Sequence, residues 1–401
     1  MLCAGSGWAV IDDGFSGGRT ATRLALDGLG GDQPAELLIV FAGAQHSADE
    51  FRAVLNGVRD VGGDATIIGG STTGIITVTN EIENSSAVAV LALGGGVKIP
   101  PPFVVASLRE DPREAGAKLG RLARARLGAT MEGAALVVLA DPHQLDATAF
   151  ANGIAEGAPG LAVVGAGVSS REDGGARVFS DGEALSDAAV GFLIPARLRP
   201  SIGTSHGCQA VSKSFPITAV EHNVILEIDG RPAIEVLKDV LDLPDNRPLE
   251  KLSVPLLAGL GDRLCDGRSD YVVRPFVVPD ESPRSLALPE PMRVGQTIRF
   301  TLRDAISARE DMKAMLEEQT QEWKAAPPTF GLFFNCAGRG SALYGQSGLD
   351  PELIHRRFGA LPMVGIESTF EIAPTCGQPQ VHMLTGVLLL AGGEERPPAI
   401  A

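Results

Sequence analysis

The feature that most constrains this chain is an internal repeat with three visible copies. In each copy an apolar run ends at a polar or glycine-containing turn, an amphipathic helix follows, and a second apolar run ends in glycine and hydroxyl residues. The paired runs are 37–42 with 65–73, 135–140 with 161–170, and 331–336 with 361–369. Unbroken apolar strands are typical of sheets covered on both faces, so the repeat predicts strands packed between helices.

Helical signals accompany the copies. Ser47 and Glu50 have the spacing of a capping box in the first copy, and in the third Asp350 can cap a helix whose first turn accommodates Pro351. The helices inside the copies are predicted at 49–60, 147–156 and 351–358. Further helices precede the copies at 18–29, 112–127 and 304–323, and further apolar strands follow them at 87–93, 189–194 and 386–390. The repeated unit is therefore helix, strand, helix, strand.

This pattern predicts an α/β protein in which repeated helix-strand-helix-strand units form two mixed, largely parallel sheet domains with helices packed on them. The Pro-containing stretch 194–200 follows the last strand of the second copy, and the residues that come directly after it do not continue the repeated pattern. We therefore expect a domain at 1–200 with two copies and a domain at 201–401 with the third. The gap between the second and third copies holds one extra unit's length.

Composition favours a folded cytoplasmic protein. The chain has 401 residues, 44% hydrophobic and 21% charged, which suits two or three globular domains. A net charge of −15 argues against nucleic acid or an anionic membrane as partner, since both select basic surfaces. No apolar stretch reaches membrane-spanning length, and the N-terminus lacks the order of a signal peptide. The five scattered cysteines form no Cys-x-x-Cys pair, so we expect free thiols and no structural zinc.

Several segments together carry a family resemblance. They are 227–237, 271–274, 295–304 and 335–340 in the second half, and 40–42 with 67–74 in the first. On these segments the chain resembles the FIST family, named for F-box and intracellular signal transduction proteins. One departure is the turn Gly69-Gly70-Ser71-Thr72, which lacks the cysteine usual in the family. A thiol-dependent role for the first half is therefore not expected.

The resemblance implies a bacterial sensory module that binds a small ligand, with amino acids as the proposed ligands. Such modules occur alone or attached to signalling enzymes such as histidine kinases and cyclases. This chain has no room for an attached output domain, so we expect the signal to pass to a separate polypeptide of that kind. Some relatives bind haem and respond to nitric oxide. No cofactor is predicted here. Haem remains an alternative because relatives use it and six histidines are available as axial ligands, although the chain has no Cys-x-x-Cys-His.

The repeat also predicts where a ligand binds. In open parallel sheets, ligands sit at the carboxyl ends of the strands, where loops and helix N-termini converge. The first strands of the copies are followed by His46, His143 and Arg339. The second strands end near Ser71 with Thr72, Ser169 with Ser170, and Ser368 with Thr369.

The turn from Asn335 to Gly340 is the sharpest of these positions. Gly338 and Gly340 flank Arg339, so the backbone can bend closely around an anion while the guanidinium holds a carboxylate or phosphate through two hydrogen bonds. Beside the third copy's second turn, Glu367 and Glu371 can hold an ammonium group. Together these groups suit an amino acid. In the alternative interpretation, Arg339 only satisfies carbonyl groups at a strand end.

Two other functions stay open. Cys336 is a ligand contact, a core residue or the nucleophile of an enzyme, and the last role requires His355 or His382 to lie within hydrogen-bond reach. The spacing shows no such base, so we predict no catalytic residue and favour a protein that is not an enzyme. His206 and Cys208 are too few ligands to predict a metal site. An interaction scaffold without a ligand is the third hypothesis.

Overall fold

The computed structural model describes residues 2–10, 13–30, 34–43, 48–96, 99–172, 174–243, 256–261, 268 and 270–393. The chain divides into two compact units, one of Met1–Thr204 with Lys313–Ala401 and one of Ser205–Met312. The third sequence copy lies in the same unit as the first two. The mixed α/β class predicted from the sequence is confirmed.

Three repeats, which lie in the first unit except for Ser205 and the start of α6 (Ala305–Glu322) up to Met312, share one order of elements: strand, helix, strand, helix, strand, hairpin, strand. The third repeat has two short helices where the others have their second helix. The first repeat comprises β1 (Cys3–Val10), α1 (Gly14–Gly28), β2 (Ala35–Gly43), α2 (Ala48–Gly62), β3 (Thr66–Thr72), β4 (Gly74–Ile76), β5 (Glu81–Glu83) and β6 (Ala87–Gly94). The second comprises β7 (Phe103–Ala106), α3 (Pro112–Leu127), β8 (Ala135–Ala140), α4 (Ala147–Gly157), β9 (Ala162–Gly167), β10 (Val178–Ser180), β11 (Glu183–Leu185) and β12 (Ala188–Ile194). The third comprises β13 (Ser201–Ser205), α6 (Ala305–Glu322), β22 (Phe330–Cys336), α7 (Gly340–Tyr344), α8 (Leu349–Phe358), β23 (Met363–Ser368), β24 (Phe370–Thr375), β25 (Gln378–His382) and β26 (Gly386–Ala391).

The three sheets of this unit have matching strand orders, and each borrows its last two strands from another repeat. The orders are β1-β6-β2-β3-β10-β11, β7-β12-β8-β9-β24-β25 and β13-β26-β22-β23-β4-β5. Thus hairpin β4–β5 of the first repeat completes the third sheet, β10–β11 completes the first, and β24–β25 completes the second. We call this unit the three-repeat ring, after the cyclic exchange of hairpins.

Within each sheet, parallel pairing joins the two strands that the sequence repeat identified. These pairs are β2 with β3, β8 with β9 and β22 with β23, and the strands on either side run antiparallel to them. The predicted closing strands are confirmed as β6, β12 and β26. The sheets are therefore mixed, with parallel pairing confined to the middle pair.

A glycine recurs at the same register position in all three parallel pairs. Gly69, Gly165 and Gly365 lie opposite Val40, Val138 and Phe333. A Cβ at these glycines would lie 1.7, 1.8 and 2.2 Å from the carbonyl oxygen of the opposite residue. Only a residue without a side chain fits so close to a neighbouring strand, which explains why each copy carries a glycine there.

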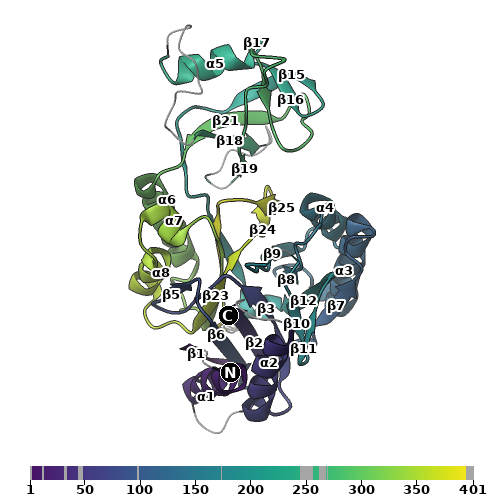
Figure 1. The fold of residues 1–401 in the computed structure, drawn as a ribbon, viewed down its shortest axis with the longest axis vertical. Coiled ribbons are helices and arrows are strands. Elements are labelled where there is room, and N and C mark those ends of the chain that lie inside the picture. The colour runs from purple at the N-terminus through teal and green to yellow at the C-terminus, as the bar shows by residue number, and fades with distance from the viewer. Residues whose placement is uncertain are drawn as a thin grey trace, which may run out of the picture. The chain divides into compact units, whose positions relative to one another are not determined.

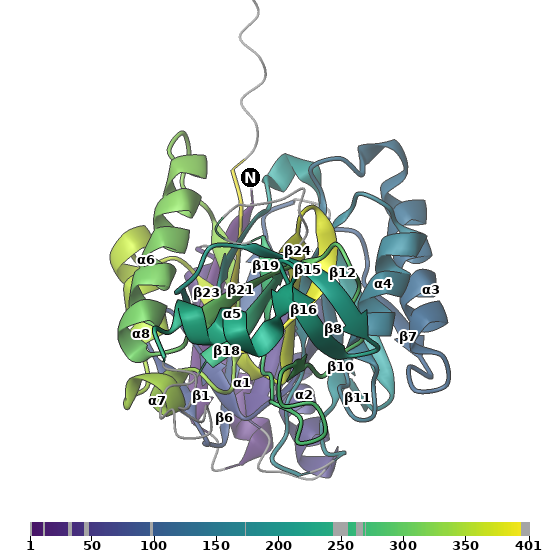
Figure 2. The ribbon, with the colours of Figure 1, turned by 90° about the horizontal axis from the view of Figure 1, so that it is seen from above.

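Both faces of the sheets are covered, as the apolar runs predict. One buried cluster combines side chains of all three sheets, including Phe41, Phe192 and Phe334. On the outer faces, Phe51 of α2 packs against the first sheet and Phe150 of α4 against the second. Figure 1 shows the helices of the three repeats on three sides of the strands, and Figure 2 shows α6 with α8 opposite α3 with α4.

The second unit has its own sheet and core. It contains β14 (Gln209–Ala210), β15 (Phe215–Glu221), β16 (Val224–Ile228), β17 (Arg231–Pro232), α5 (Ala233–Val240), β18 (Leu256–Gly261), β19 (Tyr271–Arg274), β20 (Leu286–Ala287) and β21 (Thr297–Leu302). The main strand order is β17-β16-β15-β21-β18-β19. Apolar residues of α5 pack on this sheet in a separate buried cluster that includes Ile217 and Phe300.

The structure also bears on the predictions made for the cysteines and for the capping box. Cys3, Cys208 and Cys336 are reduced thiols, as predicted. The prediction is wrong for Cys376, which is disulfide-bonded, and Cys265 lies outside the described residues, as does Ser47 of the predicted capping box. No helix in the described part of the chain is long and apolar enough to cross a membrane.

Candidate functional site

The hydroxyl-containing turns after β3, β9 and β23 meet inside the three-repeat ring. The hydroxyl of Ser71 donates to the carbonyl oxygen of Ser169 at 2.9 Å, and that of Thr72 donates to the carbonyl oxygen of Glu367 at 2.9 Å. The backbone amide of Thr73 donates to the Ser169 hydroxyl at 2.9 Å. The repeat therefore brings together the strand ends at which the sequence predicts a ligand, and their hydroxyl groups link the repeats to one another.

Ser368 and Thr369 make the corresponding contacts for the third repeat. The buried Ser368 hydroxyl lies 3.0 Å from the carbonyl oxygen of Asn335 and 2.7 Å from Oε1 of Glu371. Thr369 donates its hydroxyl to the carbonyl oxygen of Gly167 at 3.2 Å. These two side chains thus hold the end of β23 against its neighbours.

Arg339 holds a carboxylate through two hydrogen bonds, and that carboxylate belongs to the chain itself. Its Nε and Nη2 atoms lie 2.9 and 3.1 Å from the two carboxylate oxygens of Asp350, and both side chains are 0% exposed. The Tyr344 hydroxyl donates to the same carboxylate at 2.8 Å. The pair fixes the turn before α7 to the start of α8.

The predicted capping role of Asp350 is wrong. Helix α8 begins at Leu349 with Gly348 as its N-cap, so Asp350 lies inside the first turn, where its carboxylate meets Arg339. An acidic residue in the first turn still favours the helix dipole. Each of these buried charges is compensated by the other. Removing one partner of such a pair leaves an uncompensated buried charge and lowers the free energy of unfolding by about 3–5 kcal/mol.

Three carboxylates gather at the same end of the ring. Glu81 and Glu83 of β5 and Glu367 of β23 each place a carboxylate oxygen within 4.8 Å of the others. Glu81 and Glu367 are buried, and Glu83 is half-buried. We call these residues the carboxylate cluster. It joins a hairpin of the first repeat to a strand end of the third.

Backbone and side-chain donors hold the carboxylate cluster in place. Glu81 accepts hydrogen bonds from the backbone amide of Gly348 at 2.8 Å and from Nδ2 of Asn335 at 3.0 Å. Glu83 accepts from the backbone amide of Ser341 at 2.6 Å and from the Ser341 hydroxyl. Thr73 donates its hydroxyl to Glu367 at 2.9 Å.

Gly340 is required for this arrangement. Its φ is +53°, and a Cβ there would lie 2.3 Å from an oxygen of Glu83. Gly338 lies half-buried in the same turn. The two glycines that the sequence singled out beside Arg339 therefore belong to the turn that approaches the carboxylate cluster.

Burial changes the acidity of the cluster. It raises the pKa of Glu81 to about 7, and the negative charges of Asp350 and Glu83 raise it further against the opposing effect of the hydrogen bonds. Burial likewise raises the pKa of Glu367 to about 7. At neutral pH these carboxylates stand between the protonated and the charged form, and a cation placed among them would favour the charged form.

Glu371, the second predicted ammonium ligand, lies in different surroundings. It is 0% exposed. It accepts hydrogen bonds from the Ser368 hydroxyl at 2.7 Å and from the backbone amide of Thr385 at 3.3 Å. Burial raises its pKa above the usual range, and the charge of Arg339 opposes that rise.

The remaining predicted residues are histidines and Cys336, which lies in register with Ser368 and donates its backbone amide to the carbonyl oxygen of Thr385 at 2.9 Å. His46 lies outside the described residues. The backbone amide of His143 donates to Asp141 at 3.0 Å, at the end of β8. Cys336 is 8% exposed. Of the two histidines considered as bases, His355 has its Nδ1 atom 2.9 Å from the carbonyl oxygen of Gly359, and His382 has its Nε2 atom 3.1 Å from the Thr375 hydroxyl.

Sequence reasoning missed Glu81 and Glu83. The available signal was the alternation Glu-Ile-Glu, since residues two apart on a strand point to the same face. What it could not show is that β5 joins the sheet of the third repeat, which is what brings these carboxylates to Glu367.

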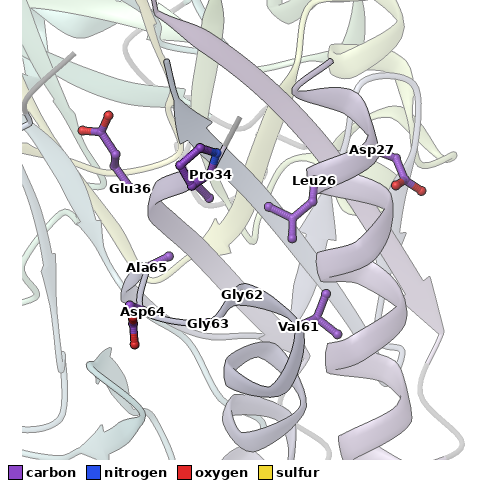
Figure 3. Close-up of a pocket in the computed structure, with 10 residues that line it drawn as sticks. Leu26, Asp27, Pro34, Glu36, Val61, Gly62, Gly63, Asp64 and Ala65 are labelled. Atoms are coloured by element: carbon purple, nitrogen blue, oxygen red, sulfur yellow. The ribbon is translucent and has the colours of Figure 1, made fainter. Parts of the chain in front are cut away.

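A surface hollow lies elsewhere. It has a volume of about 980 Å³ and lies where α1 and α2 end and β2 begins. Figure 3 shows Asp27 and Leu26 on the α1 side and Val61 and Asp64 at the end of α2. This is the amino end of β2, whereas the predicted ligand residues follow the carboxyl ends of the strands.

The fold and its polar centre define a mixed α/β repeat protein with buried acidic groups where the repeats meet. Family models for the FIST N domain and the FIST C domain match residues 36–231 and 233–374, so the chain belongs to the FIST family. FIST domains are small-ligand sensory domains of signal transduction.

Relatives with similar sequences cover almost the whole chain. An uncharacterized protein of Mycobacterium tuberculosis strain H37Rv is 27% identical over 390 residues, 96% of this chain and 98% of the relative. An uncharacterized protein of Mycobacterium bovis is 26% identical over the same shares. Among solved structures, cyanuric acid hydrolase from A. caulinodans has a TM-score of 0.29 and 11% identity, with coverage of 48% of this chain and 71% of that one.

Proposed function

We propose that this protein is a cytoplasmic sensor of a small polar ligand with an ammonium group, such as an amino acid, which binds at the carboxylate cluster. The observation that carries the proposal is the meeting of Glu81, Glu83 and Glu367 within 4.8 Å, with two of the three buried. Like charges so close together and shielded from water are unfavourable unless protons or a cation neutralise them.

An ammonium group matches this cluster in charge and in hydrogen bonding. It carries three donors and no acceptor, and the cluster offers three carboxylates, which are acceptors when charged. Binding would replace protons held by Glu81 and Glu367 with the positive charge of the ammonium group. The affinity should therefore rise as pH rises through about 7, the pKa of both groups in the folded protein.

Arg339 has an indirect role in this proposal. Through Asp350 it fixes the turn and helix start from which the amides of Ser341 and Gly348 donate to Glu83 and Glu81. It can hold a ligand carboxylate directly only if Asp350 releases it. The predicted contact of Arg339 with the ligand thus becomes a positioning role.

The same geometry suggests how binding would be signalled. Glu81 and Glu83 belong to the first repeat but lie in the sheet of the third. Neutralising their charge would reduce the repulsion with Glu367 and so stabilise the packing of hairpin β4–β5 on the third repeat. The resulting change would pass to a separate polypeptide, with a histidine kinase or a cyclase as the proposed partner.

The proposal can be tested by thermal shift with amino acids, amines and the matching hydroxy acids, which lack the ammonium group. The wild type should be stabilised by one class of amine and not by its hydroxy counterpart. Glu367→Gln should lose that response, while Glu352→Gln, a change in a surface pair with Arg356, should keep it. An equal response to amine and hydroxy acid would contradict the proposal.

The mass and absorbance spectrum of the native protein provide an independent check. A co-purified amine would support the proposal and identify the ligand class. A Soret band would replace it with the haem alternative.

A further inference from the structure

The second unit occupies a connection that is short in the other repeats. In the first repeat β1 ends at Val10 and α1 begins at Gly14, and in the second β7 ends at Ala106 and α3 begins at Pro112. In the third repeat β13 ends at Ser205 and α6 begins at Ala305. Since these elements hold the same places in the repeat, the segment 206–304 is additional to it.

This segment has the components of an independent fold. Its strands pair among themselves, in the order β17-β16-β15-β21-β18-β19. Its buried cluster is drawn from residues 217–300, with Ile217, Ile228 and Phe300 all 0% exposed. A sheet with its own apolar core is what a domain needs to fold alone.

The ring remains continuous at the point of insertion. A Cβ on Gly203 of β13 would lie 2.5 Å from side-chain atoms of both Met315 and Gln319 of α6. Trp323 donates its indole N–H to the Ser201 hydroxyl at 2.7 Å. Strand and helix therefore pack closely within the ring, as β1 does with α1, where a Cβ on Gly5 would lie 2.1 Å from a helix carbonyl oxygen.

From these observations we infer that residues 206–304 form a module inserted into the third repeat, and that the three-repeat ring is a separate folding unit which holds the whole carboxylate cluster. The junction between the two matched family segments, at 231–233, then lies inside the module and does not separate the two folding units. The ring takes residues from both family segments. This inference rests on topology and packing, so its failure would leave the ligand proposal untouched.

The test uses the full chain and two matched core substitutions. Phe300→Ala removes a ring from the core of the module, and Phe334→Ala removes one from the core of the ring, and both side chains are 0% exposed. Unfolding in urea, followed by hydrogen exchange with peptide resolution, reports on each unit separately. We expect two transitions, with each substitution lowering the midpoint of its own transition only.

Hydrogen exchange makes the outcome decisive even where the two transitions overlap. Compared with the wild type, peptides from 215–228 should exchange faster in Phe300→Ala and at an unchanged rate in Phe334→Ala. Peptides from 330–336 should show the reverse. Faster exchange of both sets in both variants would mean one cooperative unit and would overturn the inference. If Phe334→Ala proves too unstable to purify, the Phe300→Ala comparison alone still decides between these results.

Discussion

Replacing Glu367 by glutamine should change stability in a way that depends on pH. In the folded protein its pKa is raised from 4.5 to about 7, because burial penalises the charged form. A raised carboxyl pKa contributes stability that is fully present below 4.5 and is lost as pH rises through about 7. At about 1.4 kcal/mol per pH unit, this loss amounts to roughly 3 kcal/mol by pH 8.

Glutamine keeps nearly the shape of the protonated side chain and has no charge to desolvate. At pH 5 Glu367→Gln should therefore unfold with a free energy close to that of the wild type. At pH 8 the variant should be more stable by up to about 3 kcal/mol, because the folded pKa of about 7 already includes the hydrogen bond from Thr73. The difference in stability between variant and wild type should therefore change between pH 5 and pH 8 only because the Glu367 carboxyl of the wild type loses its proton.

The assay is urea unfolding at pH 5 and pH 8, compared with Glu352→Gln. That control removes a carboxylate which is 47% exposed and should shift stability by less than about 0.5 kcal/mol at either pH. Since other groups titrate as well, the quantity to compare is the difference between variant and wild type. A Glu367→Gln protein that is destabilised equally at both pH values would refute the reasoning, because it would show that the carboxylate is not a buried charge.

Three further predictions concern the surroundings of the site. Arg339→Met should destabilise the protein by about 3–5 kcal/mol in urea unfolding, because it strands the buried Asp350, and adding Asp350→Leu should recover part of the loss; additive losses would argue against the pair. Gly365→Ala should cost more than about 2 kcal/mol, since its Cβ would lie 2.2 Å from a carbonyl oxygen, whereas Gly331→Ala, whose nearest contacts are side-chain atoms at 3.3 Å, should cost less than half as much. The Cys208 thiol should resist alkylation at pH 8 in the folded protein, because burial raises its pKa to about 11, and labelling followed by mass spectrometry would reveal a reactive thiol if this is wrong.

The local elements of the ring could be predicted because their signals are local. The apolar run around Val40 and the helical spacing from Phe51 to Val58 depend only on neighbouring residues, and both elements form as expected. The glycines and hydroxyls at the strand ends also have a period that is visible in the sequence. These signals by themselves indicate a site near Ser71 and Glu367.

The partners of the site residues were beyond such reasoning. Asp350 has the sequence context of a helix cap, and its pairing with Arg339 depends on how the turn before α7 folds back. Glu81 reaches Asn335 only because a hairpin joins the sheet of another repeat. A strand records in its own sequence which face is buried, but not which distant strand lies beside it.

The exchange of hairpins has a consequence for synthesis on the ribosome. Ile75 of β4 pairs with Ile366 of β23, so a strand that is synthesised early cannot pair until one of the last strands has been made. Until β23 emerges, the hairpin exposes unpaired backbone groups and the apolar faces of Ile75 and Ile76, which are 0% exposed in the finished fold. Pairings between such distant residues form slowly. A chain terminated before β23 would carry an open strand edge, and it should be recognised by chaperones or proteases although its first two repeats are intact in sequence.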